Sequence, residues 1–212
     1  MSGLFITFEG GDGSGKSTQI RMLAERLRAL GYEVRTFREP GGMAPGDAGE
    51  RIREILLDPV HTSLDVRAEL LLYEASRAQL VAAHYRPALE AGVMVLCDRY
   101  ADSSVAYQGY GRDVLPVDEV RELNRIATGG LVPDLTLLLD VDPAAGLEQA
   151  TAAGADRLEA AGLEFHERVR AGYLEIAAAE PGRVKLIHRG GVDEVAREVW
   201  LHVEPLLGGA TP

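Results

Sequence analysis

Residues 10–17 combine glycines, a lysine and a serine at the spacing Gly-x-x-x-x-Gly-Lys-Ser, which is typical of a phosphate-binding loop. The segment follows an apolar run at residues 4–8 and leads into residues 19–27, whose apolar positions have helical spacing. In such a loop, backbone N–H groups and a helix N-terminus face phosphate oxygens. Lys16 can reach the outer phosphates, and the Ser17 hydroxyl can bind Mg²⁺. The pattern predicts a nucleoside triphosphate site made of Gly10, Gly11, Asp12, Gly13, Ser14, Gly15, Lys16, Ser17 and Thr18.

Charged pairs follow two other predicted strands. Arg38-Glu39 comes after residues 33–37, and Asp98-Arg99 comes after residues 93–97. Because ligands gather at the carboxyl ends of parallel strands, both pairs should lie near the phosphate-binding loop. Asp98 stands where an acid holds Mg²⁺ together with Ser17, so these two residues are the predicted metal ligands. Arg38 and Arg99 suggest a second anion site facing the triphosphate, which a nucleotide kinase needs and a GTPase switch does not.

Short apolar runs alternate with helical stretches along the whole chain. This alternation predicts an α/β fold, a doubly wound parallel five-stranded sheet flanked by helices. We expect one domain over residues 1–207 and a flexible tail at 208–212. The expected strands are 3–9, 33–37, 93–97, 135–140 and 183–187. The expected helices are 16–30, 47–57, 64–85, 101–108, 116–128, 143–153, 158–179 and 191–206.

Composition restricts the classes of function. The chain has 212 residues, which suits one α/β domain, and a single cysteine, Cys97, which excludes an internal disulfide. The net charge of −11 argues against a nucleic-acid surface, which needs clustered lysine and arginine. No apolar run approaches the roughly 20 residues of a membrane span, and the N-terminus leads into a strand rather than a secretory segment. We therefore expect a cytoplasmic enzyme or nucleotide switch with no nucleic-acid or membrane partner.

Three longer motifs follow the loop in a specific order: Arg38-Glu39-Pro40-Gly41-Gly42, Asp98-Arg99-Tyr100 and Ala106-Tyr107-Gln108-Gly109. With these motifs, and with matches along nearly its whole length, the chain resembles bacterial thymidylate kinases, which phosphorylate dTMP with ATP. The resemblance implies a P-loop kinase fold with a mobile lid at about residues 143–158. It also implies Mg²⁺ as the cofactor, ATP and dTMP as small-molecule substrates, and a homodimer.

The resemblance also implies roles at the base of dTMP. Tyr73 would stack on the thymine ring, and stacking on an aromatic side chain contributes roughly 1–3 kcal/mol per base. Arg77, one helical turn later, would donate to thymine O4, where cytosine carries an amino group. Ser104 and Gln108 are similar to the remaining partners of the base edge. Tyr107 would crowd the 2′ carbon of the sugar and disfavour ribose.

Other implied roles concern phosphate and metal. Arg53 and Arg99 match the residues that hold the dTMP phosphate, while Asp12 and Glu39 match acids near the 3′-hydroxyl and the magnesium waters. No general base is needed, because the accepting phosphate oxygen is already ionised. The resemblance assigns catalysis to Lys16, Arg99, Arg157 and Asp12.

The chain departs from the family pattern in two respects. The turn at residues 43–49 looks a few residues longer than the usual turn of the family, and the other departure concerns a catalytic arginine. Family members supply a transition-state arginine from the loop or from the lid. Here the loop position is Gly13, and the lid carries Glu148 and Gln149 where lid-type members are basic. Arg157 is the arginine that remains there, so either Arg157 supplies this charge alone, or the enzyme is slower or depends more on Lys16 and Arg99.

Two other functions stay open at this point. The chain could be another nucleotide or deoxynucleoside kinase of the same fold, although a nucleoside acceptor would need a base to remove its hydroxyl proton. It could instead be a regulatory P-loop nucleotide switch. That alternative predicts no second nucleotide site and leaves Tyr73, Arg77 and Gln108 unexplained.

Overall fold

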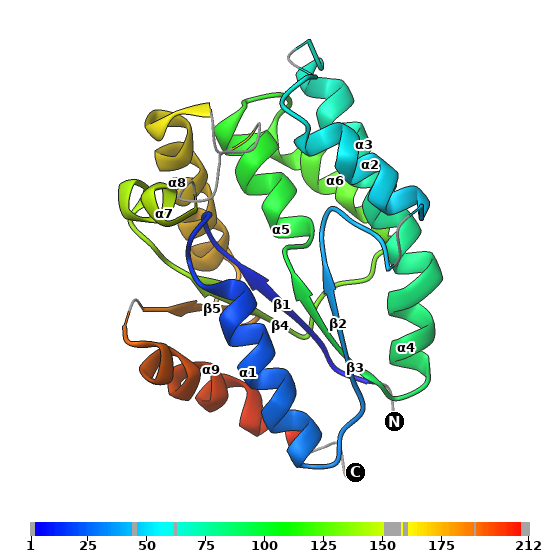
Figure 1. Cartoon of the computed structure of the whole chain (residues 1–212), viewed down its shortest axis with the longest axis vertical. Coiled ribbons are helices and arrows are strands. Elements are labelled where there is room, and N and C mark those ends of the chain that lie inside the picture. The colour runs from blue at the N-terminus through cyan, green and yellow to red at the C-terminus, as the bar shows by residue number, and fades with distance from the viewer. Residues whose placement is uncertain are drawn as a thin grey trace.

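The centre of the molecule is a parallel sheet, seen edge-on between helices in Figure 1. The structure is a computed structural model that describes residues 3–43, 46–61, 63–150, 158, 161–188 and 190–208. Within these residues the sheet has five strands in the order β2-β3-β1-β4-β5, and every neighbouring pair is parallel. The prediction of a five-stranded parallel sheet is therefore confirmed. The strands are β1 (Phe5–Glu9), β2 (Val34–Arg38), β3 (Met94–Asp98), β4 (Leu135–Leu139) and β5 (Val184–Ile187).

The described helices agree with the predicted stretches within a few residues, with two exceptions. The stretch expected to end at residue 85 continues as a helix to Glu90, and the helix expected from residue 158 begins at Leu163. Gly162 has φ +90°, outside the helical region, so α8 can begin only after it. The helices are α1 (Lys16–Ala29), α2 (Ala48–Leu57), α3 (Val66–Leu80), α4 (Arg86–Glu90), α5 (Ala101–Ser104), α6 (Val117–Thr128), α7 (Pro143–Ala150), α8 (Leu163–Ala179) and α9 (Val192–Leu207). Two π-helical segments, η1 (Val81–Tyr85) and η2 (Val105–Gly111), continue α3 and α5.

Both faces of the sheet are covered, which explains why β1 is buried along its whole length. Ile6 and Phe8 pack in one core with residues of α1 and α9, which lie side by side in Figure 1. Successive strand residues point to opposite faces. Phe5, Thr7 and Glu9 therefore face the other layer, where η1, α4, α5 and α8 pack. None of the described helices is long and apolar enough to cross a membrane.

The sheet topology brings the ends of separate strands together. Phe8 of β1 pairs with Asp98 of β3, and Glu9 pairs with Leu138 of β4. The segments that follow β1, β3 and β4 therefore leave the sheet at one edge, around the central strand. This is where an open α/β sheet binds its ligands.

Candidate active site

The loop after β1 has the backbone shape of a phosphate cradle. Gly10, Gly13 and Gly15 have φ of 134°, 69° and 87°, values that residues with a side chain rarely adopt. The side chain of Lys16, the first residue of α1, turns back over the loop, and its Nζ donates to the Gly10 carbonyl at 3.2 Å. Burial, and next the nearby charge of Arg99, lower the pKa of Lys16 to about 8. A bound polyphosphate would supply the negative charge that this buried cation needs.

Ser17 and Asp98 lie together beside the loop. The Ser17 hydroxyl donates to Oδ2 of Asp98 at 2.9 Å, which joins the start of α1 to the end of β3. Hydroxyl and carboxylate oxygens are ligands that Mg²⁺ accepts, usually together with waters and substrate phosphates. Across the described residues, no cluster of three or more His, Cys, Asp or Glu side chains could hold a metal by itself. The two oxygens therefore fit a magnesium ion that arrives with a nucleotide.

Arg99 connects the loop to the neighbouring cavity. Its φ of 68° is a left-handed conformation, which costs roughly 1–2 kcal/mol for a residue with a side chain. In this conformation Nη1 donates to the Gly10 carbonyl at 3.0 Å, while Nη2 donates to Oδ1 of Asp12 at 2.6 Å and to the Tyr107 hydroxyl at 3.0 Å. The strained backbone thus aims one guanidinium at both the phosphate loop and the cavity wall.

Asp12, which accepts a hydrogen bond from Arg99, is held as an ion between the phosphate-binding loop and the cavity. Burial by itself would raise the pKa of Asp12, but the charges of Arg99 and Lys16 outweigh it and lower that pKa to about 2. The Tyr107 hydroxyl also donates to Oδ2 of Asp12, at 2.9 Å. Asp12 therefore carries a full negative charge at neutral pH and fixes the position of Arg99.

A cavity of about 200 Å³ opens beside Asp12 and Arg99. Its wall contains most of the residues that the sequence assigned to the acceptor nucleotide. The predicted residues on the wall are Asp12, Glu39, Arg53, Tyr73, Arg99, Ser104, Tyr107 and Gln108. Four further lining residues were not predicted: Pro40, Leu57, Ser103 and Leu158. Of these, Ser103 had a signal in the sequence, because it belongs to a serine doublet that begins five residues after Asp98.

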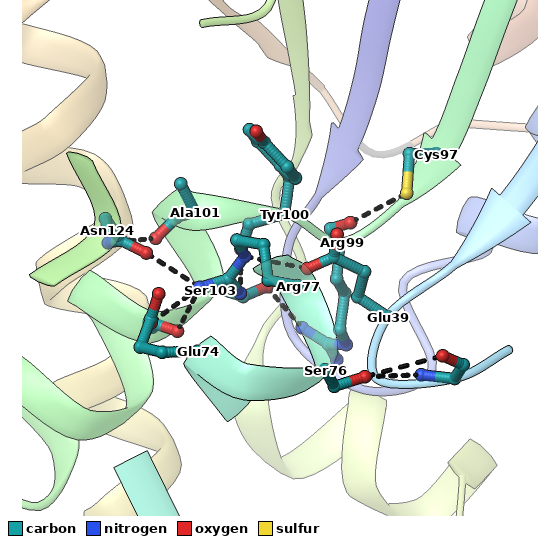
Figure 2. A network of polar contacts seen from close by, with 12 residues as sticks. Glu39, Glu74, Ser76, Arg77, Cys97, Arg99, Tyr100, Ala101, Ser103 and Asn124 are labelled. Carbon is teal, nitrogen blue, oxygen red and sulfur yellow. Dashed lines mark hydrogen bonds and ion pairs between the residues drawn. The ribbon is translucent and has the colours of Figure 1, made fainter. Parts of the chain in front are cut away.

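Arg77 does not line the cavity but lies directly behind its wall, at the centre of the polar network in Figure 2. Its side chain is 1% exposed, and its Nε donates to Oε2 of Glu39 at 2.7 Å. Its remaining acceptors are Glu74 Oε1 at 2.6 Å, Asn124 Oδ1 at 2.7 Å, Ser104 Oγ at 2.9 Å and the Tyr100 carbonyl at 3.0 Å. Arg77 thus holds two cavity residues, Glu39 and Ser104, in place. Its contact with the base stays a prediction.

Two buried glutamates belong to the surroundings of the cavity, Glu39 as part of its wall and Glu9 as a partner of the wall residue Ser103. Burial raises the pKa of Glu39 to about 7 despite the opposing effect of Arg77. Burial, and next the charge of Asp102, raise the pKa of Glu9 to about 7 as well. Glu9 accepts from the Ser103 hydroxyl at 2.5 Å and from the Tyr173 hydroxyl at 2.8 Å. The sequence analysis did not assign Glu9 a role, because only the folded structure shows that it contacts a residue of the cavity wall.

The arginines that line the acceptor cavity differ from the two expected at the strand ends. Arg38 pairs with Glu50 at 3.1 Å, and its side chain is 57% exposed. It borders a separate groove beside Ser17, so the expectation that Arg38 faces the acceptor site is wrong. Arg53 of α2 lines the cavity instead, with its Nη1 donating to the Pro40 carbonyl at 2.7 Å. The acceptor cavity therefore carries two cations, Arg53 and Arg99.

Part of the expected lid is described. Residues 143–150 form α7, which packs against the phosphate-binding loop so closely that a Cβ on Gly13 would lie 2.2 Å from the Gly146 carbonyl oxygen. Asp140, just before α7, makes a bidentate ion pair with Arg170 of α8, and each of the two hydrogen bonds is 2.7 Å long. Arg157, the predicted transition-state cation, lies outside the described residues.

Comparison with known proteins decides the family. A family model described as thymidylate kinase matches residues 8–199. Thymidylate kinase from Deinococcus radiodurans is 52% identical over 204 residues, which cover 95% of this chain and 96% of that protein. The chain belongs to the thymidylate kinase family. It is therefore a nucleotide-binding phosphotransferase, and the reading as a regulatory switch is disfavoured.

Further relatives agree over the full length. A thymidylate kinase from a Synechococcus strain is 51% identical over 211 residues, 98% of each chain. The crystal structure of thymidylate kinase from Ehrlichia chaffeensis matches with a TM-score of 0.79 at 34% identity, covering 96% of this chain and 99% of that one. The resemblance stated from the sequence motifs is thus confirmed, and so is the P-loop kinase fold.

Proposed function

We propose that the protein transfers the γ-phosphate of ATP to dTMP, giving dTDP and ADP. The observation that carries this proposal is the position of Arg99, which contacts both the phosphate-binding loop and the cavity that holds Tyr73 and Gln108. A guanidinium placed there can neutralise charge on both nucleotides. The family to which the chain belongs supports the same reaction.

On the donor side, the loop N–H groups and Lys16 bind the β- and γ-phosphates. Ser17 and Asp98 would hold Mg²⁺, and the bound ion would neutralise charge on the phosphates. The Lys16 ammonium, now hydrogen-bonded to the loop itself, turns to the phosphates when they arrive. Its contacts with loop carbonyls keep it close to its site of action beforehand.

On the acceptor side, Tyr73 stacks on the thymine ring, while Ser104 and Gln108 face the base edge. Tyr107 restricts the sugar, and Arg53 and Arg99 hold the 5′-phosphate. Because this phosphate is already ionised, transfer requires only positioning and neutralisation of charge. Arg77 keeps the wall that carries Ser104 and Glu39 in place, and we keep the prediction that it also reads O4.

Arg157 supplies the transition-state charge in this proposal. A lid arginine that reaches the transferred phosphoryl group only during transfer would speed the chemical step without tightening substrate binding. Asp12 assists differently, because its ion pair with Arg99 at 2.6 Å fixes the guanidinium between the two nucleotides.

One assay tests the function. ADP formation is measured with dTMP, dUMP, dCMP, AMP, thymidine or no acceptor, and Lys16→Ala serves as the inactive control. We expect dTMP to give the highest kcat/KM. Fast ADP formation with thymidine would favour a deoxynucleoside kinase, and equal rates with and without acceptor would contradict any nucleotide kinase.

Assembly and location remain proposals. We propose a homodimer that uses α3 and α6, where Leu71 is 56% exposed and Ile126 is 63% exposed. We also propose that the protein acts in the cytoplasm, without nucleic-acid or membrane partners. Sedimentation of the purified protein at several concentrations tests the dimer.

A further inference from the structure

A buried carboxyl group contacts one of the residues that line the acceptor cavity. Glu69 of α3 is 0% exposed, and its Oε1 accepts a hydrogen bond from Nε2 of Gln108 at 3.1 Å. The Nε of Arg112 lies 3.6 Å from the same oxygen. The Arg112 guanidinium thus places a positive charge beside the buried carboxyl group, and buried acids need such a partner.

The contact determines which way the Gln108 amide points. Oε1 of Glu69 accepts the hydrogen bond from Nε2, so the amide NH₂ group of Gln108 faces Glu69. The carbonyl oxygen Oε1 lies at the opposite side of the same planar group. Gln108 also lines the cavity, so Oε1 is the atom of this amide available to a ligand there. Without Glu69, either orientation of the amide could be adopted.

Helix geometry relates this contact to the base. Glu69 and Tyr73 are four residues apart on α3, so they lie on the same helix face. Tyr73 lines the cavity, and Gln108 of η2 lines it too. The oriented amide therefore lies beside the ring on which the base stacks, where it can meet the edge of that base.

We infer that Glu69 is a positioning residue that makes Gln108 a hydrogen-bond acceptor toward the acceptor base. The inference rests on the proposed function. Thymine presents an N–H at N3, which can donate to Gln108 Oε1. Cytosine has a lone pair at N3, which the same oxygen repels. Glu69 therefore selects against cytosine nucleotides without touching them, and it adds to any discrimination made at O4.

The test compares two acceptors that share the 5-methyl group and differ at N3 and C4, namely dTMP and 5-methyl-dCMP. For each, kcat/KM is measured in Glu69→Gln, Gln108→Leu and the double variant, with Glu122→Gln as the control. Glu122 lies on the exposed surface of α6, and its side chain is 53% exposed. A glutamine at position 69 can pair with Gln108 in either orientation, so the amide is released.

We expect Glu69→Gln to reduce the dTMP to 5-methyl-dCMP ratio of kcat/KM about tenfold, the value of one hydrogen bond. The change should come from the KM of the acceptor and leave the KM of ATP unchanged. Gln108→Leu should reduce the ratio similarly. Because Glu69 acts through Gln108, Glu69→Gln should have no further effect on the ratio in the Gln108→Leu background, and Glu122→Gln should match wild type.

Three outcomes would overturn the inference. One is an equal loss with both acceptors in Glu69→Gln, and another is an undiminished effect of Glu69→Gln on the ratio when Gln108 is already leucine. The third applies if circular dichroism shows that Glu69→Gln does not fold. In that case a wild-type ratio of kcat/KM for dTMP over 5-methyl-dCMP in Gln108→Leu is enough to overturn the inference. Absence of dTMP turnover in wild type would instead refute the proposed function itself, so the two failures are distinguishable.

Discussion

Replacing Arg77 by methionine should destabilise the protein strongly, in addition to any effect on dTMP. The guanidinium is buried between the carboxylates of Glu39 and Glu74, at 2.7 and 2.6 Å, with side-chain exposures of 3% and 7%. Methionine fills similar space but leaves both carboxylates without a counter-charge. Removing one partner of a buried ion pair costs about 3–5 kcal/mol, so Arg77→Met should lose about that much unfolding free energy at about pH 8.

The loss should depend on pH, and the sign follows from the carboxylates. A buried carboxylate without its cation is protonated in the folded variant, while it stays ionised in the unfolded chain above its ordinary pKa. Each such group changes the free energy of unfolding by about 1.4 kcal/mol per pH unit, with more stability at lower pH. Glu39 has a pKa of about 7 in wild type, so it is only half ionised in the middle of this range, and its protonation in the variant should make the loss about 1.4 kcal/mol smaller at about pH 6 than at about pH 8.

Urea unfolding of wild type and Arg77→Met at the two pH values measures both quantities. Arg67→Met, an exposed arginine of the same helix, is the matched control and should change stability by less than about 0.5 kcal/mol. Adding Glu74→Gln to Arg77→Met should recover part of the loss at the higher pH. A loss below about 1 kcal/mol, or one that is equal at both pH values, would refute the view that Arg77 compensates buried charge.

Four other predictions follow from the site. Lys16→Ala should lower kcat at least about 100-fold while the fold persists, because a preorganised cation is lost; steady-state rates and circular dichroism check this, and near-normal turnover would contradict the loop assignment. Gly13→Ala should destabilise the protein by about 1–3 kcal/mol, because its φ is 69° and its Cβ would meet a carbonyl at 2.2 Å; a thermal melt equal to that of wild type would contradict this contact. Arg157→Ala should lower the single-turnover rate at least about 100-fold with little change in dTMP affinity, and a loss under about fivefold would assign the charge elsewhere, for example to Arg99. The pKa values of Glu9 and Glu39 are both raised to about 7, so the stability that these groups contribute is fully present below their ordinary pKa and is lost as pH rises through about 7. The free energy of unfolding in urea should fall over this pH range, and a value that does not change with pH would contradict the prediction.

What the sequence predicts well here is chemistry that depends on neighbouring residues. The glycines of the loop and the pairing of Ser17 with Asp98 follow from local motifs at strand ends, and the structure brings these two side chains to 2.9 Å. The sheet was predictable because its strands are almost wholly apolar and alternate with helices. Such features require only the direction of the chain and the topology of a parallel sheet.

The contacts that depend on burial between distant elements were not predictable. Arg38 and Arg53 are both arginines near the same strand end, and nothing in the local pattern shows that only Arg53 turns toward the cavity. Similarly, nothing in the sequence distinguishes Glu69 from any other acidic residue in a helix rich in leucine. Its contact with Gln108 joins residues 39 positions apart and exists only after α3 and η2 have packed.

The tight packing of Gly13 on Gly146 has a consequence for how enzymes of this family could be interconverted. An ideal Cβ on Gly13 would overlap the Gly146 carbonyl, and one on Gly146 would lie 2.5 Å from the Asp12 carbonyl oxygen. Grafting an arginine into the loop of this chain would therefore push α7 outward before the new cation could reach a phosphate. A graft needs a redesigned α7 as well, so a side chain at position 13 cannot be accommodated in this chain by one substitution.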